Sequence, residues 1–130
     1  MSLINTPISV GELLDKITIL EIKSEKIKDA EKLKNINHEL SLLTEIWSQG
    51  GFEGEAMEDL RRQLKKVNQT LWVIEDDIRL EEKCKSFGEK FIQLARSVYF
   101  ENDTRAKVKK EINLLTGSEL VEEKSYEDYQ

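Results

Sequence analysis

The chain has 130 residues, of which 35% are charged and 38% are hydrophobic, and its formal net charge is −6. This length fits one domain with one core, and the acidic balance argues against nucleic-acid binding, which depends on basic residues that neutralise phosphates. A single cysteine, Cys84, excludes an internal disulfide and indicates a reducing cytoplasm, and no apolar stretch approaches the ~20 residues that would insert into a membrane.

The first helix begins at Ser9, which stands three residues before Glu12 in the spacing of a capping box. Counted at ~100° per residue, Ile19 and Ile22 lie on the side of this helix opposite its main apolar stripe, which is given below. A helix that is apolar on two sides is usually buried on two sides. The main stripe has the three-four spacing of an amphipathic helix: Val10, Leu13, Ile17, Leu20 and Ile27.

The second helix is predicted to start at Asp29, a suitable N-cap, and to end at Gly50 and Gly51. Residues 49–54 form the clearest loop in the chain. The apolar stripe of this helix again alternates steps of three and four: Leu33, Ile36, Leu40, Leu43 and Trp47.

The third helix is the longest, and its regular heptad spacing predicts coiled-coil-like packing. The pattern fails at Glu81 and resumes in a shifted phase from Cys84 to Val98. Ser86 and Glu89 have the spacing of a second capping box, so we expect a break near residues 86–88. The heptad positions are Met57, Leu60, Leu64, Val67, Leu71, Ile74 and Ile78.

A last helix is predicted to start after Asn102 or Asp103, either of which can cap it, and to end at Gly117. The expected fold is therefore all-α, a helical bundle of four or five helices with one long central helix and coiled-coil-like packing. We expect a single helical domain over residues 1–130. Residues 1–8 would be an extended N-terminal arm and residues 118–130 an acidic C-terminal tail.

No residue set predicts a metal site, a cofactor site or a catalytic group. Zinc requires several Cys or His ligands, and the chain offers only His38 and Cys84. The segment GGFEG lacks the lysine of a phosphate-binding loop. The basic cluster Arg61, Arg62, Lys65 and Lys66 is interpreted as a solvated helix face.

Two polar features remain. Glu21 falls inside the apolar stripe of the first helix, and a buried carboxylate needs a partner, for which Arg79 is the expected residue. A polar line on one flank of the third helix supports either of two interpretations, interhelical bridges that fix register or a polar pocket with a tryptophan wall. The candidate ligand-binding residues are Glu21, Asn68, Trp72, Glu75 and Arg79.

Several segments resemble an uncharacterised family of short helical bacterial proteins, domain-of-unknown-function family 6165. They are ISVGELLDKITILEIKSEKI, VNQTLWVIEDDIR, ARSVYFENDTRAKVKKEIN and GSELVEEKSY. The resemblance covers about Ile8 to Tyr126, contains no short catalytic motif, and implies a stand-alone bacterial-type or phage-borne helical protein. It adds no activity, although it suggests proximity to surface-glycan genes.

The leading hypothesis is a non-catalytic protein-interaction or scaffolding module in the cytoplasm. We expect a homodimer, because the second apolar face of the first helix and the length of the third need cover. An unidentified protein partner is also expected, without nucleic acid or membrane insertion. The alternative is a small-molecule-binding protein or enzyme with a polar pocket between helices, linked to surface-glycan metabolism.

Overall fold

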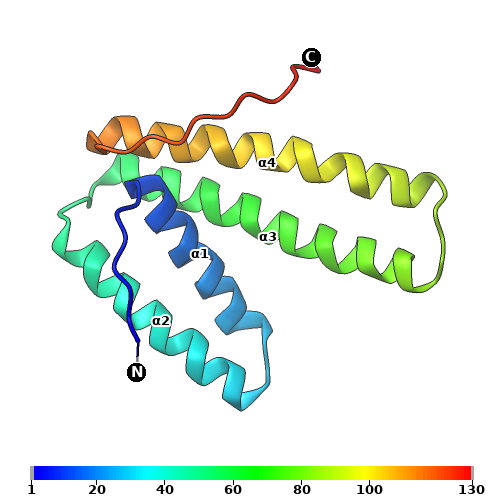
Figure 1. Cartoon of the computed structure of the whole chain (residues 1–130), viewed down its shortest axis with the longest axis horizontal. Coiled ribbons are helices and arrows are strands. Elements are labelled where there is room, and N and C mark those ends of the chain that lie inside the picture. The colour runs from blue at the N-terminus through cyan, green and yellow to red at the C-terminus, as the bar shows by residue number, and fades with distance from the viewer. Residues whose placement is uncertain (1, 130) are drawn as a thin grey trace.

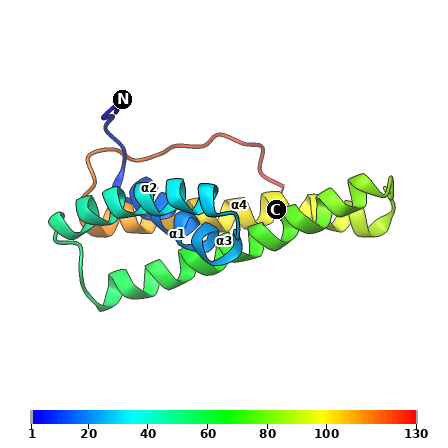
Figure 2. The same cartoon turned by 90° about the horizontal axis from the view of Figure 1, so that it is seen from below.

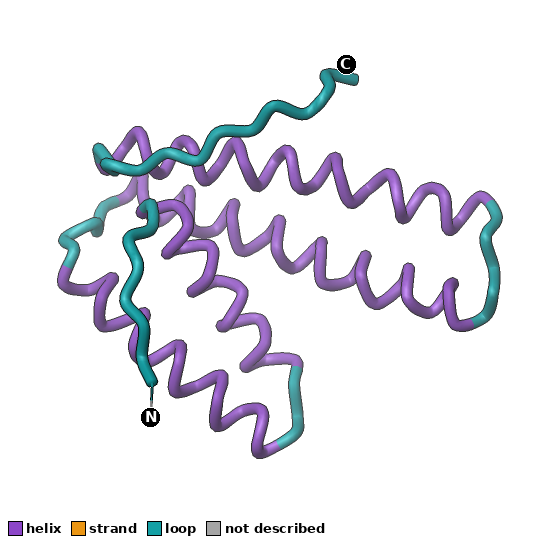
Figure 3. The backbone as a smooth tube through the Cα atoms, viewed as in Figure 1, coloured by secondary structure: helices purple, strands orange, loops and turns teal. Residues whose placement is uncertain are grey.

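The computed structural model describes residues 2–129 and contains four helices, shown in Figures 1 and 3. They are α1 (Val10–Lys26), α2 (Ala30–Gln49), α3 (Glu55–Lys83) and α4 (Glu89–Thr116). No strand occurs within residues 2–129, so the predicted all-α bundle is confirmed. Residues 1 and 130, the outer ends of the expected arm and tail, lie outside the described range.

The helices form two antiparallel hairpins that meet at one end of the molecule (Figure 1). Helices α3 and α4 lie side by side and extend well beyond α1 and α2, which is clear from two directions (Figures 1 and 2). Helix α1 contacts each of the other three helices, whereas α2 contacts α1. The 17-residue α1 therefore joins the hairpins, and the 29-residue α3 gives the molecule its length.

The two-sided pattern of α1 has a direct explanation in this arrangement. Leu13, Leu14 and Ile17 belong to the main apolar core, and Ile22 is only 1% exposed. Asp15 and Thr18 face α3 and α4, with which they interact. Ile22 is thus covered within one chain, whereas Ile19 is partly buried and lines the cavity described below, so this face by itself does not require a dimer.

The core lies where all four helices meet, and it contains the predicted seam residues of α3. Leu64 is fully buried, and Leu71 and Ile74 are 8% exposed, as expected from their heptad positions. The loop between α2 and α3 contributes Phe52, whose ring lies 4.8 Å from that of Trp47. The main cluster consists of Leu13, Leu14, Ile17, Trp47, Met57, Leu60, Leu64, Val108 and Ile112.

Two predicted N-caps are confirmed. The hydroxyl of Ser9 accepts a hydrogen bond from the Glu12 amide at 3.1 Å. The carboxylate of Asp29 accepts from the amides of Glu31 and Lys32. At the C-terminal end of α4, Gly117 has φ 64°, the left-handed conformation that ends the helix.

The predicted fourth and fifth helices are one continuous helix, so the expected start at Asn102 or Asp103 is wrong. Asn102 lies in the middle of α4, where its side chain accepts a hydrogen bond from Arg105 instead of capping. The predicted break near residues 86–88 is confirmed, but the capping box of Ser86 and Glu89 is wrong. Helix α4 begins after Gly88 without a side-chain cap, and the Ser86 amide donates to the Glu81 carbonyl at the end of α3.

The outer part of the α3–α4 hairpin differs from the rest of the bundle. Every side chain from residue 75 to residue 107 is exposed or only partly buried. Within residues 2–129, no helix combines the length and hydropathy needed to cross a bilayer. The outer hairpin, residues 75–107, is called the hairpin tip below.

Helix α1 approaches α4 most closely at Gly11. A Cβ atom at this position would lie 2.6 Å from the carbonyl oxygen of Lys109 and 3.0 Å from Oδ1 of Asn113. The Gly11 amide donates to that Oδ1 at 2.7 Å, so the contact is polar as well as close. The glycine is therefore needed for space, and its backbone bonds the two helices.

We predict that Gly11→Ala lowers the free energy of unfolding by about 1–3 kcal/mol, because the added methyl group overpacks a backbone contact. At an open helix position the same change would raise stability by up to ~1 kcal/mol. Urea denaturation measures the difference, and Ser41→Ala on the exposed face of α2 is the control. A stabilised Gly11→Ala variant would show that α1 and α4 are not in contact here.

Candidate functional site

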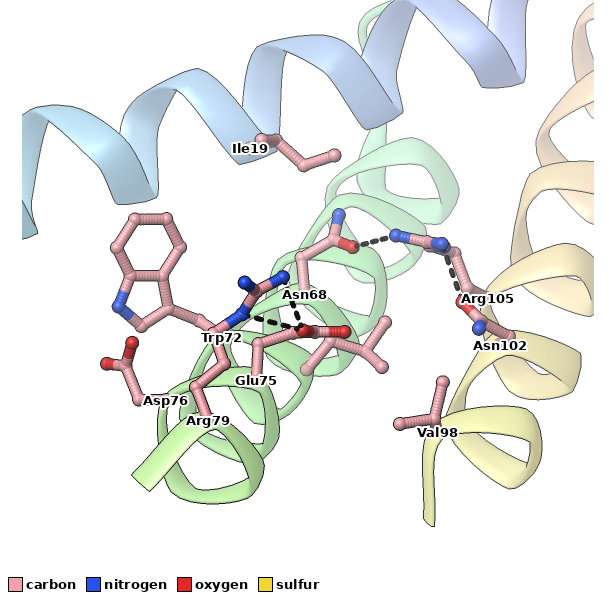
Figure 4. A pocket seen from close by; sticks show the side chains of 10 residues that line it. Ile19, Asn68, Trp72, Glu75, Asp76, Arg79, Val98, Asn102 and Arg105 are labelled. Atoms are coloured by element: carbon pink, nitrogen blue, oxygen red, sulfur yellow. Dashed lines mark hydrogen bonds and ion pairs between the residues drawn. The ribbon is translucent and has the colours of Figure 1, made fainter. Parts of the chain in front are cut away.

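Four of the five predicted ligand-binding residues line one cavity between α1, α3 and α4 (Figure 4). The cavity has a volume of about 400 Å³ and is open to solvent. Its walls combine apolar and charged groups: Ile19 of α1, Asn68, Leu71, Trp72, Glu75, Asp76 and Arg79 of α3, and Val98, Asn102 and Arg105 of α4.

Arg105 of α4 is held at the cavity by two neutral side chains. Its Nη1 donates to Oδ1 of Asn68 at 3.0 Å, and its Nη2 donates to Oδ1 of Asn102 at 2.6 Å. Figure 4 shows these two bonds across the cavity from Trp72. The amide oxygens orient the guanidinium without cancelling its charge.

Asn68 is itself fixed from behind by α1. Its Nδ2 donates to Oδ1 of Asp15 at 2.8 Å and to Oγ1 of Thr18 at 3.0 Å, and the residue is 4% exposed. Both partners are also buried. A continuous chain of hydrogen bonds therefore runs from the interior of α1 through Asn68 to Arg105.

Lys109, one turn beyond Arg105, balances the charge of Asp15. Its Nζ lies 3.6 Å from Oδ2 of Asp15, and it donates to Glu12 at 2.7 Å and to Glu122 at 3.1 Å. Burial by itself lowers the pKa of Lys109, but the hydrogen bonds to Glu12 and Glu122 and the charge of Asp15 outweigh burial, so the pKa is raised. The ammonium thus stabilises the fold at pH values below its ordinary pKa, and this contribution is lost as the pH rises through the raised value.

The fifth predicted residue, Glu21, does not line this cavity, and its expected pairing with Arg79 is wrong. Glu21 accepts a hydrogen bond from Arg61 at 3.3 Å, where α1 passes the first half of α3. Arg79 instead pairs with Glu75 at 3.3 Å, one turn away on its own helix. The interpretation of the basic cluster as a solvated helix face is wrong for Arg61 and Lys65, because both form ion pairs with α1.

Trp72 and its apolar neighbours give the cavity a surface for a planar or aliphatic group. The indole is partly exposed and lies beside Ile19 in Figure 4, opposite Arg105 in that view. The Glu75–Arg79 pair and the carboxylate of Asp76 lie along the α3 wall. Within residues 2–129, no group of three His, Cys, Asp or Glu side chains is placed to hold a metal ion. The arrangement is suited to binding and orienting a polar molecule.

Arg105 and Asn102 were missed because the apolar spacing stops at Val98. The three-four spacing in fact continues from Val98 through Asn102, Arg105 and Lys109 to Ile112, with polar residues at core positions. Polar residues in register with an apolar stripe were therefore the available signal.

The C-terminal segment runs back along α4 (Figures 1 and 2) and is attached to it at both ends. Near its start, Glu122 accepts from Lys109, which lowers the pKa of Glu122, so this attachment weakens as the pH falls through the lowered value. Near its end, the hydroxyl of Tyr129 donates to Asp103, and its ring packs against Tyr99 and Phe100. The hydrogen bond to Asp103 raises the pKa of Tyr129 to about 12.

A family model described as a family of unknown function, DUF6165, matches residues 4–129. This match extends slightly beyond the resemblance over residues 8–126. No curated protein and no solved structure matches the chain.

We predict that removing the Lys109 ammonium destabilises the fold through Asp15. Lys109→Met should cost about 3–5 kcal/mol, because it leaves a buried carboxylate without its cation. Asp15→Asn combined with Lys109→Met should cost clearly less than the sum of the two single changes, which urea denaturation would reveal as a coupling of about 1 kcal/mol or more. Lys16→Met is the control, since Lys16 is exposed and also pairs with Glu12. Additive costs would mean that Lys109 does not compensate Asp15.

We further predict that Tyr129 ionises with a pKa of about 12, because its phenol donates to an ionised carboxylate. Carbon-13 NMR of labelled tyrosine resolves the individual rings during a pH titration. Asp103→Ala should bring the Tyr129 value toward the ordinary ~10, and Tyr126→Phe should leave it unchanged. A Tyr129 value near 10 in the unaltered chain would contradict the docked position of the C-terminal segment.

Proposed function

Because the chain belongs to the family of unknown function DUF6165, whose description names no activity, we propose a function from the chain's own surface. We propose a non-catalytic interaction module that self-associates through the hairpin tip and acts as a scaffold. The observation that carries this proposal is the absence of any buried residue from 75 to 107. A two-helix hairpin that buries so little needs a partner to cover its apolar side chains.

Two pairs of exposed apolar side chains, one on each helix of the hairpin tip and its base, follow the heptad repeat. Val73 and Leu80 are seven residues apart on α3, and they are 52% and 57% exposed. Ile92 and Tyr99 have the same separation on α4, and they are 46% and 41% exposed. Residues seven apart lie on the same side of a helix, so each helix carries an apolar flank. Isolated exposed apolar residues are ordinary, and we propose that these aligned pairs form the contact surface.

A second copy of the same chain is the occupant that best suits this surface. The hairpin tip contains seven basic and eight acidic residues, whereas the whole chain has a net charge of −6. Two tips can therefore approach with little net repulsion, and their mixed charges can pair across the contact. Two hairpins packed together would form a four-helix, coiled-coil-like bundle, and twofold dimers are the commonest soluble assembly.

The cellular setting is proposed on chemical grounds. Cys84 is a free, exposed thiol on the hairpin, a position suited to a reducing cytoplasm. Two chains joined through their hairpin tips would carry their α1–α2 hairpins at opposite ends of the dimer. We propose that the further protein partner of a scaffold binds these α1–α2 hairpins.

We predict that the chain sediments with the mass of two chains at tens of micromolar. Leu80→Glu and Ile92→Glu should each shift the mass toward one chain, because a charge placed in an apolar contact loses its hydration. Both positions are exposed, so the monomer's fold should tolerate the changes.

Ile46→Glu is the matched control, because Ile46 is 53% exposed on α2, away from the hairpin tip. This variant should sediment like the unaltered chain. Sedimentation equilibrium of the unaltered chain at a single-chain mass, or equal dissociation of all three variants, would contradict self-association through the tip.

A further inference from the structure

We propose that the cavity between α1, α3 and α4 binds a small organic carboxylate with a planar apolar body. In this proposal Arg105 receives the carboxylate and Trp72 packs against the body. This proposal uses different observations from those behind self-association, and six of the ten lining residues belong to the hairpin tip. It rests on how Arg105 is held, on what surrounds it, and on the shape of the cavity.

Arg105 differs from two arginines of α3 that are paired with carboxylates. Arg61 and Arg79 each lie 3.3 Å from a carboxylate, Glu21 and Glu75 respectively. The two hydrogen bonds of Arg105 go to the amide oxygens of Asn68 and Asn102. A guanidinium carries five N–H donors, so donors and a full positive charge remain for an anionic group.

The guanidinium is oriented before any ligand arrives. Asn68 is 4% exposed and is bonded to Asp15 and Thr18 in the interior, which fixes the oxygen that Arg105 contacts. A preorganised group loses little conformational entropy on binding, which favours affinity for a small molecule. Asp15 in turn lies near Lys109, so its negative charge is compensated without Arg105.

The rest of the cavity selects the body of the ligand. Trp72 lies across the cavity from Arg105 in Figure 4, and Ile19, Leu71 and Val98 supply further apolar surface. Its volume of about 400 Å³ is within the range of small-molecule sites, ~300–1,000 Å³. A flat ring fits between an indole and branched aliphatic side chains, where stacking and dispersion stabilise it.

The charges on the α3 wall favour a carboxylate over a phosphate. Asp76 and Glu75 both line the cavity, and only Glu75 has an ion pair with Arg79 there. A doubly charged phosphate would be repelled by this wall more strongly than a singly charged carboxylate. The planar fork of Arg105 also matches the two oxygens of a carboxylate.

Benzoate, benzamide and phenyl phosphate provide the test, because they share a ring and differ in the charged group. Binding is followed on the full chain by proton–nitrogen NMR at constant ionic strength, through the Trp72 indole and the amides of residues 68–79 and 98–105. We expect benzoate to bind at least tenfold more tightly than benzamide, since one hydrogen bond to a charged group changes affinity by roughly ten- to a hundredfold. Phenyl phosphate should bind more weakly than benzoate.

Arg105→Gln keeps a hydrogen-bonding side chain and removes the charge, so benzoate affinity should fall at least tenfold. Arg96→Gln makes the same change at an exposed position of α4 and should leave the affinity within about twofold. Equal binding of benzoate and benzamide to the unaltered chain overturns the proposal, as does the absence of saturable shifts at these residues. This comparison needs no variant, so it decides the matter even where Arg105→Gln fails to fold. Tighter binding of phenyl phosphate overturns the choice of a carboxylate.

Discussion

The carboxylate of Asp15 is the group on which the arrangement of three helices depends. It is 8% exposed, and a charge at this depth is tolerated only with an opposite charge and hydrogen bonds nearby. Asn68 of α3 supplies a hydrogen bond at 2.8 Å, and Lys109 of α4 supplies an ammonium at 3.6 Å. One side chain of α1 therefore fixes the position of both long helices. Apolar packing alone would leave neighbouring registers of the helices closer in energy, whereas this polar contact is satisfied in one register.

The same contact determines the character of the cavity. Asp15 is balanced by Lys109, and Lys109 is further surrounded by Glu12 and Glu122. Arg105 is separated from Asp15 by the neutral amide of Asn68, so the guanidinium is oriented by the buried network without being neutralised by it. Structural and ligand-facing charges are thus kept apart by a single asparagine. The cavity also lies where the buried part of the α3–α4 hairpin gives way to the hairpin tip.

Apolar spacing was sufficient to predict helices and the burial of the α3 seam, and capping residues were sufficient to predict the helix starts at Ser9 and Asp29. These features depend on local sequence and on one period. It was insufficient wherever polar residues occupy core positions. The phase of α4 continues through Asn102, Arg105 and Lys109, and a count of apolar residues loses it there. The partner of Glu21 was assigned to the wrong arginine because the pairing depends on where α1 crosses α3. Periodicity within each helix contains no information on that crossing, which places Arg61 rather than Arg79 beside Glu21.

The uneven burial along the long hairpin has a consequence for how the molecule opens. All the buried apolar residues lie outside residues 75–107, so the hairpin tip can separate and lose its helical hydrogen bonds while the four-helix end stays intact. Backbone amides near the turn at residues 84–88 then exchange with solvent through this local unfolding, and those beside Leu14, Leu64 and Ile112 exchange only when the whole chain unfolds. The α3 residues that line the cavity, from Asn68 to Arg79, span the boundary between these two regions. A molecule bound in the cavity would therefore contact the residues through which local unfolding of the hairpin tip would have to spread to reach the core.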